Sequence, residues 1–304
     1  MIDSDTLSVL EYAVGRGSKD GSAWGRLGRG YSNAGQHEIA GEAFRLATRL
    51  APEVPDHWSG LALACMHRGD DSGALEAAQK ATHLAPQDPY ALALFAHQLY
   101  KADREREAIP FAQEAVRLAP SWALAKGLVG LAQSSAGDHG GAVAALEASL
   151  RLDMDRPELW VALGTSLAEL GRFDEAANAL ETAVFHTPGN ASAWGRLGQA
   201  RTELGRHREA IRCFEKAVEL GFAPWGLWID MGRSAAEVRD IRVLGRAYEQ
   251  LREEHPKDAE VLKGKLRRLQ GHRRAGRRRR RRARPFAGSH APGQALLFSP
   301  TELR

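Results

Sequence analysis

The sequence predicts an all-α protein: a right-handed superhelical solenoid of about seven helix–turn–helix repeats with capping helices. Three observations lead to this prediction. Similar residues recur every 34 positions, large apolar residues within each segment recur at three- and four-residue spacing, and small residues stand where two helices would cross. One pair of helices cannot bury both of its apolar faces, so neighbouring pairs must stack to form a continuous core.

The 34-residue register runs from Gly21 to Asp258 without an inserted residue. Its eighth position is always Gly or Ala, and its twentieth position is Ala in six segments and Leu244 in the seventh. A small residue at these two places lets the helices of one pair approach closely. Tryptophan occupies the fourth position in five of the seven segments, at Trp24, Trp58, Trp160, Trp194 and Trp228. We expect these tryptophans to hold the fold and to take no part in chemistry.

The first segment carries the motif most clearly. The sequence of residues 24–31 is W-G-R-L-G-R-G-Y, and Ala40, Phe44, Ala47 and Pro52 follow. This pattern resembles the tetratricopeptide repeat (TPR), whose 34 residues follow W-x2-L-G-x2-Y, then A-x3-F, then P. The resemblance implies a concave groove lined mainly by positions 2, 5, 6, 9, 12 and 13 of each first helix. Such a groove would bind a peptide or helical segment of a partner protein.

The register also sets the expected domain boundaries. Residues 1–20 would form an N-terminal capping half-repeat, residues 259–271 a C-terminal capping helix, and residues 272–304 a basic, disordered tail. Between them the seven repeats are expected at 21–54, 55–88, 89–122, 123–156, 157–190, 191–224 and 225–258.

The middle of the implied groove is apolar. In the third to fifth repeats, the groove positions that the resemblance assigns carry mostly large apolar residues: Tyr90, Leu94, His97, Tyr100, Leu124, Leu128, Leu131 and Val161. A strip of this kind favours an apolar or amphipathic partner segment. The alternative is that neighbouring helices or a folded-back tail cover it.

Charged residues occupy other groove positions. Position 13 carries Glu169, Glu203 and Glu237 in the last three repeats, a spacing that predicts a ladder of carboxylates attracting a basic segment; the alternative is a solvated charged face. Arginines stand at groove positions near both ends, at Arg26, Arg29 and Arg196. The Lys and Asn residues with which co-chaperone members of the family grip a C-terminal carboxylate are absent, so a chaperone's extreme C-terminus is not an expected ligand.

The C-terminal tail is strongly basic. Between Lys263 and Arg284 there are thirteen basic residues and no acidic one, so the rest of the chain is acidic. The tail arginines are Arg273, Arg274, Arg277, Arg278, Arg279, Arg280, Arg281, Arg282 and Arg284. This run supports an alternative function, association with nucleic acid, another anionic polymer or an anionic membrane surface. A simply solvated tail and a tail docked on the protein's own groove are the other hypotheses.

Catalytic and metal-binding motifs are missing from the sequence. There is no G-x-S-x-G, Walker loop, H-E-x-x-H or Cys/His cluster at metal spacing. Cys65 and Cys213 are expected to be small core residues. No run approaches the roughly 18 apolar residues of a membrane span, and the acidic N-terminus lacks the features of a secretory signal. We therefore predict a cytoplasmic, non-catalytic scaffold or adaptor that needs no cofactor or metal and binds a protein or peptide partner.

Overall fold

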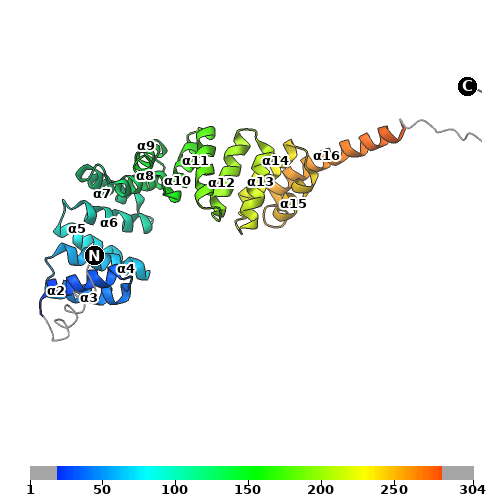
Figure 1. Ribbon diagram of the computed structural model, residues 1–304. Helices are drawn as coiled ribbons and strands as arrows, with labels where there is room; N and C mark the ends of the chain where they lie inside the picture. Colours follow the sequence, from blue (N-terminus) through cyan, green and yellow to red (C-terminus); the bar gives the residue numbers. More distant parts are fainter. Residues whose placement is uncertain (1–18, 283–304) are drawn as a thin grey trace, which may run out of the picture. The chain divides into compact units, whose positions relative to one another are not determined.

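The computed structural model describes residues 19–282, with side chains described for residues 19–271 (Figure 1). Its fifteen described helices follow one another without an intervening strand in this range. The structure divides into two compact units, residues 1–227 and residues 228–304. Residues 1–18 of the expected N-terminal half-repeat and residues 283–304 of the tail lie outside the described residues.

Six helix pairs make up the described part of the first unit. They are α2 (Gly21–Asn33) with α3 (His37–Leu50), α4 (Pro55–Arg68) with α5 (Asp71–Leu84), α6 (Pro89–Lys101) with α7 (Glu105–Leu118), α8 (Ala123–Ala136) with α9 (His139–Leu150), α10 (Pro157–Glu169) with α11 (Phe173–His186), and α12 (Ala191–Glu203) with α13 (His207–Glu219). Each helix packs chiefly on its neighbours along the chain, so the pairs stack in sequence order. The fold is therefore an all-α helical-repeat solenoid.

Small residues at the eighth position of the register explain how closely the helices of a pair approach. A Cβ atom added to Gly198 would lie 2.5 Å from the Phe214 ring, and one added to Gly164 would lie 2.5 Å from Leu180. Phe214 and Leu180 are fully buried. A larger residue at either glycine would push the second helix of its pair away from the first.

Three of the tryptophans at the fourth position link their helix pair to the turn before it. The indole Nε1 of Trp58 donates to the Pro52 carbonyl at 2.7 Å, Trp160 donates to the Met154 carbonyl at 2.9 Å, and Trp194 donates to the Pro188 carbonyl at 2.9 Å. The side chain thus covers core with its apolar body and satisfies a backbone carbonyl with its polar edge. This is the stabilising role expected for these residues.

The turn inside each pair has a backbone that favours glycine. At the fifteenth position of the register φ is positive in all seven segments. Five segments place glycine there, with φ between 70° and 87°, at Gly35, Gly69, Gly137, Gly171 and Gly205. The two exceptions are Asp103, with φ of 55°, and Arg239, with φ of 58°. An L-residue with a Cβ is strained in this left-handed region, and Asp tolerates it better than Arg.

The second unit contains the end of α14 (Trp225–Glu237), with α15 (Ile241–Leu251) and α16 (Pro256–Arg282). Met231, Leu244 and Leu262 are fully buried in its core. The backbone of α16 stays helical through Arg282, which differs from the disorder expected from residue 272 onward. One physical reason is that residues 272–282 contain no proline, which would end a helix already begun at Pro256.

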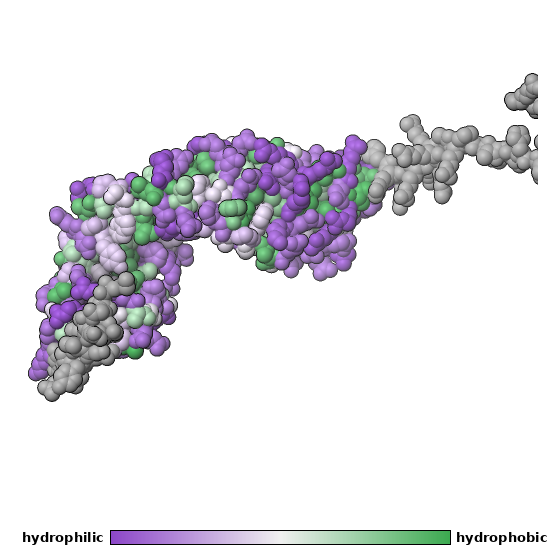
Figure 2. All heavy atoms as spheres, viewed as in Figure 1, coloured by the Kyte–Doolittle hydropathy of each residue, from purple (hydrophilic) through white to green (hydrophobic). Residues whose placement is uncertain are grey.

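Both cysteines are buried, as expected. Burial raises the pKa of the Cys65 thiol and that of the Cys213 thiol, which keeps both protonated near neutral pH. On the face shown in Figure 2, hydrophobic residues are scattered among hydrophilic ones. None of the helices in the described range combines the length and apolar composition that a bilayer-spanning segment needs.

Candidate functional site

Six of the eight predicted apolar groove residues line one cavity in the first unit. Its volume is about 340 Å³, and it lies between α6 and α8 with contributions from α4 and the start of α10. The predicted residues that line it are Tyr90, Leu94, His97, Leu124, Leu128 and Leu131. We call this cavity the apolar pocket.

The walls and the floor of the apolar pocket differ in exposure. Tyr90 and Leu124 are 44% and 49% exposed, which is unusual for side chains of this size and apolar character. Leu94 and Leu128 are each 7% exposed and belong to the hydrophobic core. The pocket therefore offers accessible apolar surface on a floor that the fold itself holds in place.

Trp122 supports the wall, although the sequence analysis did not select it. Its ring stacks on that of Tyr90, with centroids 6.3 Å apart and planes 22° from parallel. Trp122 is the residue directly before α8, at the last position of its repeat, where the family pattern names no groove residue. An aromatic residue next to the predicted Tyr90–Leu124 strip was the only signal that could have pointed to it.

His97 is the one titratable imidazole in the wall of the pocket. Burial, helped by the positive charge of Lys101, lowers its pKa, and Asp71 opposes this shift. Lys101 and Asp71 form an ion pair of 3.0 Å, which limits the effect of either charge. His97 is therefore neutral at pH 7, and the pocket around it keeps its apolar character.

A second cavity continues the apolar pocket toward α2. It measures about 320 Å³ and shares Leu63 and Tyr90 with the first cavity. The predicted Arg29 lines it and forms an ion pair of 3.4 Å with Asp56. The Ser59 hydroxyl, which also lines it, is buried without a hydrogen-bond partner among the described residues. This end of the groove is consequently polar.

Several lining residues were missed, and most stand at positions that the family pattern assigns to the groove. Glu158 occupies position 2, Ala93 and Gly127 occupy position 5, and Leu63 occupies position 9. The register could have supplied them. Arg156 precedes α10 and pairs with Glu158 at 2.8 Å, and Leu159 is a buried core residue of α10.

Other predicted residues lie outside these two cavities. Tyr100 and Val161 are half-buried against the hydrophobic core. Arg26 is 3.9 Å from Asp20. Arg196 lines a separate hollow with Phe222 and Leu227. The tail side chains from residue 272 onward are outside the described side chains, so the structure places none of the predicted basic tail residues.

The three predicted glutamates have different surroundings. Glu169 and Glu203 are exposed last residues of α10 and α12 in the first unit. Glu237 belongs to the second unit, where its carboxylate is 3.9 Å from the Lys265 ammonium. A carboxylate at a helix C-terminus meets the negative end of the helix dipole, so none of the three is favoured by its own helix.

Metal binding has no support in the described part of the chain. No group of three or more His, Cys, Asp or Glu side chains there could hold a metal ion.

Comparison with known proteins bears on the fold. The sequence pattern of the tetratricopeptide repeat matches residues 25–89 and 161–224. YrrB, described as a TPR protein with an unusual peptide-binding site, is 17% identical, with a TM-score of 0.52 over 60% of this chain and 95% of YrrB. PilF of Pseudomonas aeruginosa is 20% identical, with a TM-score of 0.58 over 71% of this chain and 97% of PilF. No curated protein sequence matches this chain.

A chain from a larger assembly has a similar fold. One chain in the crystal structure of the APC/C hetero-tetramer Cut9–Hcn1 is 18% identical, with a TM-score of 0.58 over 87% of this chain and 52% of that chain. The stacked helix pairs and the 34-residue register define a helical-repeat protein. The sequence match identifies the repeat further: residues 25–89 and 161–224 carry tetratricopeptide repeats.

Proposed function

We propose that the protein is a non-catalytic interaction scaffold whose apolar pocket binds an apolar or amphipathic segment of a partner protein. The observation that carries the proposal is the pair of large exposed side chains, Tyr90 and Leu124, standing over a buried leucine floor. Removing apolar surface from water stabilises a complex by roughly 25 cal/mol per Å² before the costs of association are subtracted. Their covering by a partner would therefore be favourable.

Two further observations agree with this function. The pocket lies on first helices, at positions where the family pattern expects the groove, and one structural neighbour is described as having a peptide-binding site. The lining that α6 and α8 supply carries no charged side chain, and the charged lining residues Arg156 and Glu158 pair with each other. The pocket therefore favours leucine-like or aromatic side chains over charged ones. The neighbouring polar cavity, with Arg29, Asp56 and Ser59, would contact the polar end of the same segment.

The test is to select ligands with the full-length protein and then alter the wall of the pocket. Peptides selected from a random phage-displayed library would be labelled, and their affinity measured by fluorescence anisotropy. We expect selected peptides to carry at least two large apolar residues. Tyr90→Ala and Leu124→Ala should each weaken binding by about tenfold, corresponding to about 1.4 kcal/mol per truncated contact.

Leu152→Ala is the matched control. Leu152 is 51% exposed, like Leu124, but it lines neither cavity, so its truncation should leave affinity unchanged. If Leu124→Ala and Tyr90→Ala bind the selected peptides as tightly as the wild type, the apolar pocket is not the binding site. The exposed wall residues are better targets than Leu128, because truncating that buried residue would also destabilise the fold.

A further inference from the structure

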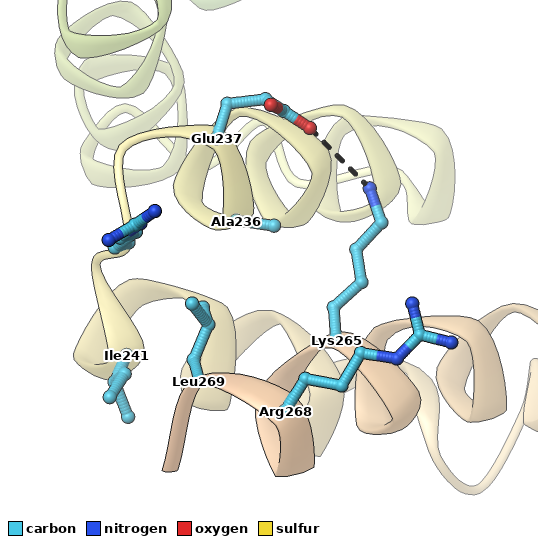
Figure 3. Close-up of a pocket in the computed structure, with 7 residues that line it drawn as sticks. Ala236, Glu237, Ile241, Lys265, Arg268 and Leu269 are labelled. Atoms are coloured by element: carbon cyan, nitrogen blue, oxygen red, sulfur yellow. Dashed lines mark ion pairs between the residues drawn. The ribbon is translucent and has the colours of Figure 1, made fainter. Parts of the chain in front are cut away.

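A further cavity, with a different lining, lies in the C-terminal unit. It has a volume of about 600 Å³ and is enclosed by the end of α14, the start of α15 and α16 (Figure 3). Apolar residues from all three helices line part of it, namely Ala236, Ile241 and Leu269. The other lining residues are Glu237 and three cations, Arg239, Lys265 and Arg268. We call this cavity the cationic pocket.

The charges of the cationic pocket are unbalanced. Figure 3 shows the one ion pair across it, in which the Lys265 ammonium lies 3.9 Å from the Glu237 carboxylate. The side chains of Arg239 and Arg268 are exposed, and neither forms an ion pair or hydrogen bond with another described side chain. Two positive charges are therefore left beside an apolar surface. A guanidinium in this position is available to a carboxylate, which it can bind through two parallel hydrogen bonds.

Arg239 occupies its position against its backbone preference. It is the fifteenth residue of its repeat, where five other repeats place glycine, and its φ of 58° lies in the left-handed region. Arginine gains nothing there that glycine would not supply more easily, because the turn needs only the backbone conformation. A strained residue whose side chain lines a cavity is a reason to look for a ligand of that side chain.

We infer that the cationic pocket binds an acidic segment of a partner protein, one in which aspartate or glutamate side chains neighbour an apolar residue. The carboxylates would pair with Arg239 and Arg268, and the apolar residue would cover Ile241 and Leu269. This lining fits a peptide better than a nucleic acid. Nucleic-acid binding depends on cations spaced along a phosphate backbone, whereas these cations surround one hollow with an apolar side.

The experiment uses the full-length protein and a defined probe. The probe is a fluorescein-labelled hexapeptide of alternating Glu and Leu, and the comparison peptide has Gln in place of Glu. Binding is measured by anisotropy at about 0.1 M salt, where exposed charges more than about 10 Å apart are largely screened. We expect the Glu–Leu peptide to bind and the Gln–Leu peptide to bind at least about tenfold more weakly, as for the loss of charge-assisted hydrogen bonds.

Arg239→Gly is the decisive variant because it removes the charge and relieves the strained turn. It should unfold at the same or a higher temperature than the wild type, and it should bind the Glu–Leu peptide about tenfold more weakly. Asp103→Gly relieves the corresponding turn of another repeat and should leave binding unchanged. Arg278→Gln removes one charge from the basic tail and should have less than about a twofold effect.

Three results would overturn the inference. The first is wild-type affinity in Arg239→Gly, and the second is an equal loss in Arg278→Gln, which would assign the binding to the tail. The third is tighter binding of a single-stranded RNA hexanucleotide than of the peptide, with the same dependence on Arg239. That result would mean that the pocket binds a phosphate chain. Leu124→Ala alters only the apolar pocket in the first unit, so it should leave the difference in affinity between the Glu–Leu and Gln–Leu peptides unchanged.

Discussion

The apolar pocket and the cationic pocket show two ways in which one repeat architecture provides surface for binding. The apolar pocket is lined by helix residues in regular register, and its floor is shared with the hydrophobic core. The cations of the cationic pocket come from the turn at Arg239 and from α16, where the repeat pattern is broken or ends. Regular positions thus supply a rigid apolar surface, and departures from the pattern supply charge.

The largest expected effect is a difference in stability between variants of the floor and of the wall of the apolar pocket. Leu128→Ala should lower the free energy of unfolding by about 2–4 kcal/mol, because it removes buried methyl groups and leaves a cavity. Leu124→Ala should cost less than about 1 kcal/mol, since half of that side chain is already in water. Urea denaturation of both variants measures the difference. Equal losses would mean that wall and floor contribute alike to the core.

Arg201, whose side chain is paired, and Arg268, whose side chain has no described partner, should contribute differently to stability. Arg201 is 18% exposed; its guanidinium lies 2.8 Å from the Glu181 carboxylate and 3.0 Å from the Cys213 sulfur. Arg201→Ala should destabilise the first unit by about 1.5–3 kcal/mol, because it leaves these partners without their donor. Arg268→Ala in the cationic pocket should change stability by less than about 0.5 kcal/mol. Urea denaturation tests both, and a stable Arg201→Ala would contradict the structural role of this network.

The pH dependence of binding should also differ between the pockets. A ligand in the apolar pocket buries His97 further and opposes its protonation, so the affinity for the ligand should be constant near pH 7 and fall once the pH drops below the ordinary His range near 6.5. The charges facing His97 are Lys101 on its own helix, Asp71 on α5 and the Arg156–Glu158 pair across the pocket. His97→Gln should remove this dependence. Anisotropy with a selected peptide measures it.

The free energy of unfolding should also fall as the pH drops. The pKa of His97 is lower in the folded protein than in the unfolded chain, so the unfolded state binds more protons as the pH falls. Wild-type stability should therefore decline from about pH 7 downward relative to His97→Gln. Binding of the Glu–Leu peptide to the cationic pocket should stay constant over this range and fall only near pH 4, where its carboxylates take up protons. If the wild type and His97→Gln lose stability equally as the pH falls, the prediction is wrong.

The smallest expected effect concerns the two turns without glycine. Arg239→Gly and Asp103→Gly should each change stability by no more than about 1 kcal/mol, with relief of the left-handed strain offset in part by the greater freedom of glycine in the unfolded chain. Arg239→Gly should be the more stabilising of the two, since Asp adopts this conformation more readily than Arg. Paired thermal denaturations decide this. A destabilised Arg239→Gly would show that the arginine side chain supports the fold.

Much of the lining of the apolar pocket could be predicted, because the repeat register indicates which face of its helix each residue occupies as well as the fold. Tyr90, Leu124 and Leu128 were placed on one face by counting from the repeat start, and they do line one cavity. The count could not distinguish Leu128, which the core buries, from Leu124, which it leaves exposed. Counting along the register also did not predict that Trp122 lines the pocket, because that residue lies between the helices whose positions the pattern describes.

The charged residues were harder to predict because their environment depends on segments distant in sequence. Glu237 has the same register position as Glu169 and Glu203, but α16 brings Lys265 to its carboxylate. The guanidinium of Arg201 contacts Glu181 and Cys213, which belong to the two neighbouring helices α11 and α13. The electrostatic effect of a charged side chain depends on the charged and polar groups near it, and the packing of the helices determines which groups those are.

The sequence by itself determined the repeat length, the helix pairs, the close approach of their helices and the face on which apolar residues gather. Those features depend on spacing along one chain and on side-chain size, which are local properties. Only the tertiary structure decided which apolar residues stay exposed and which carboxylates are neutralised. It also decided that Arg239 stands beside a cavity. Exposure and charge pairing are sums over neighbours from several helices, so they appear only when the helices are packed together.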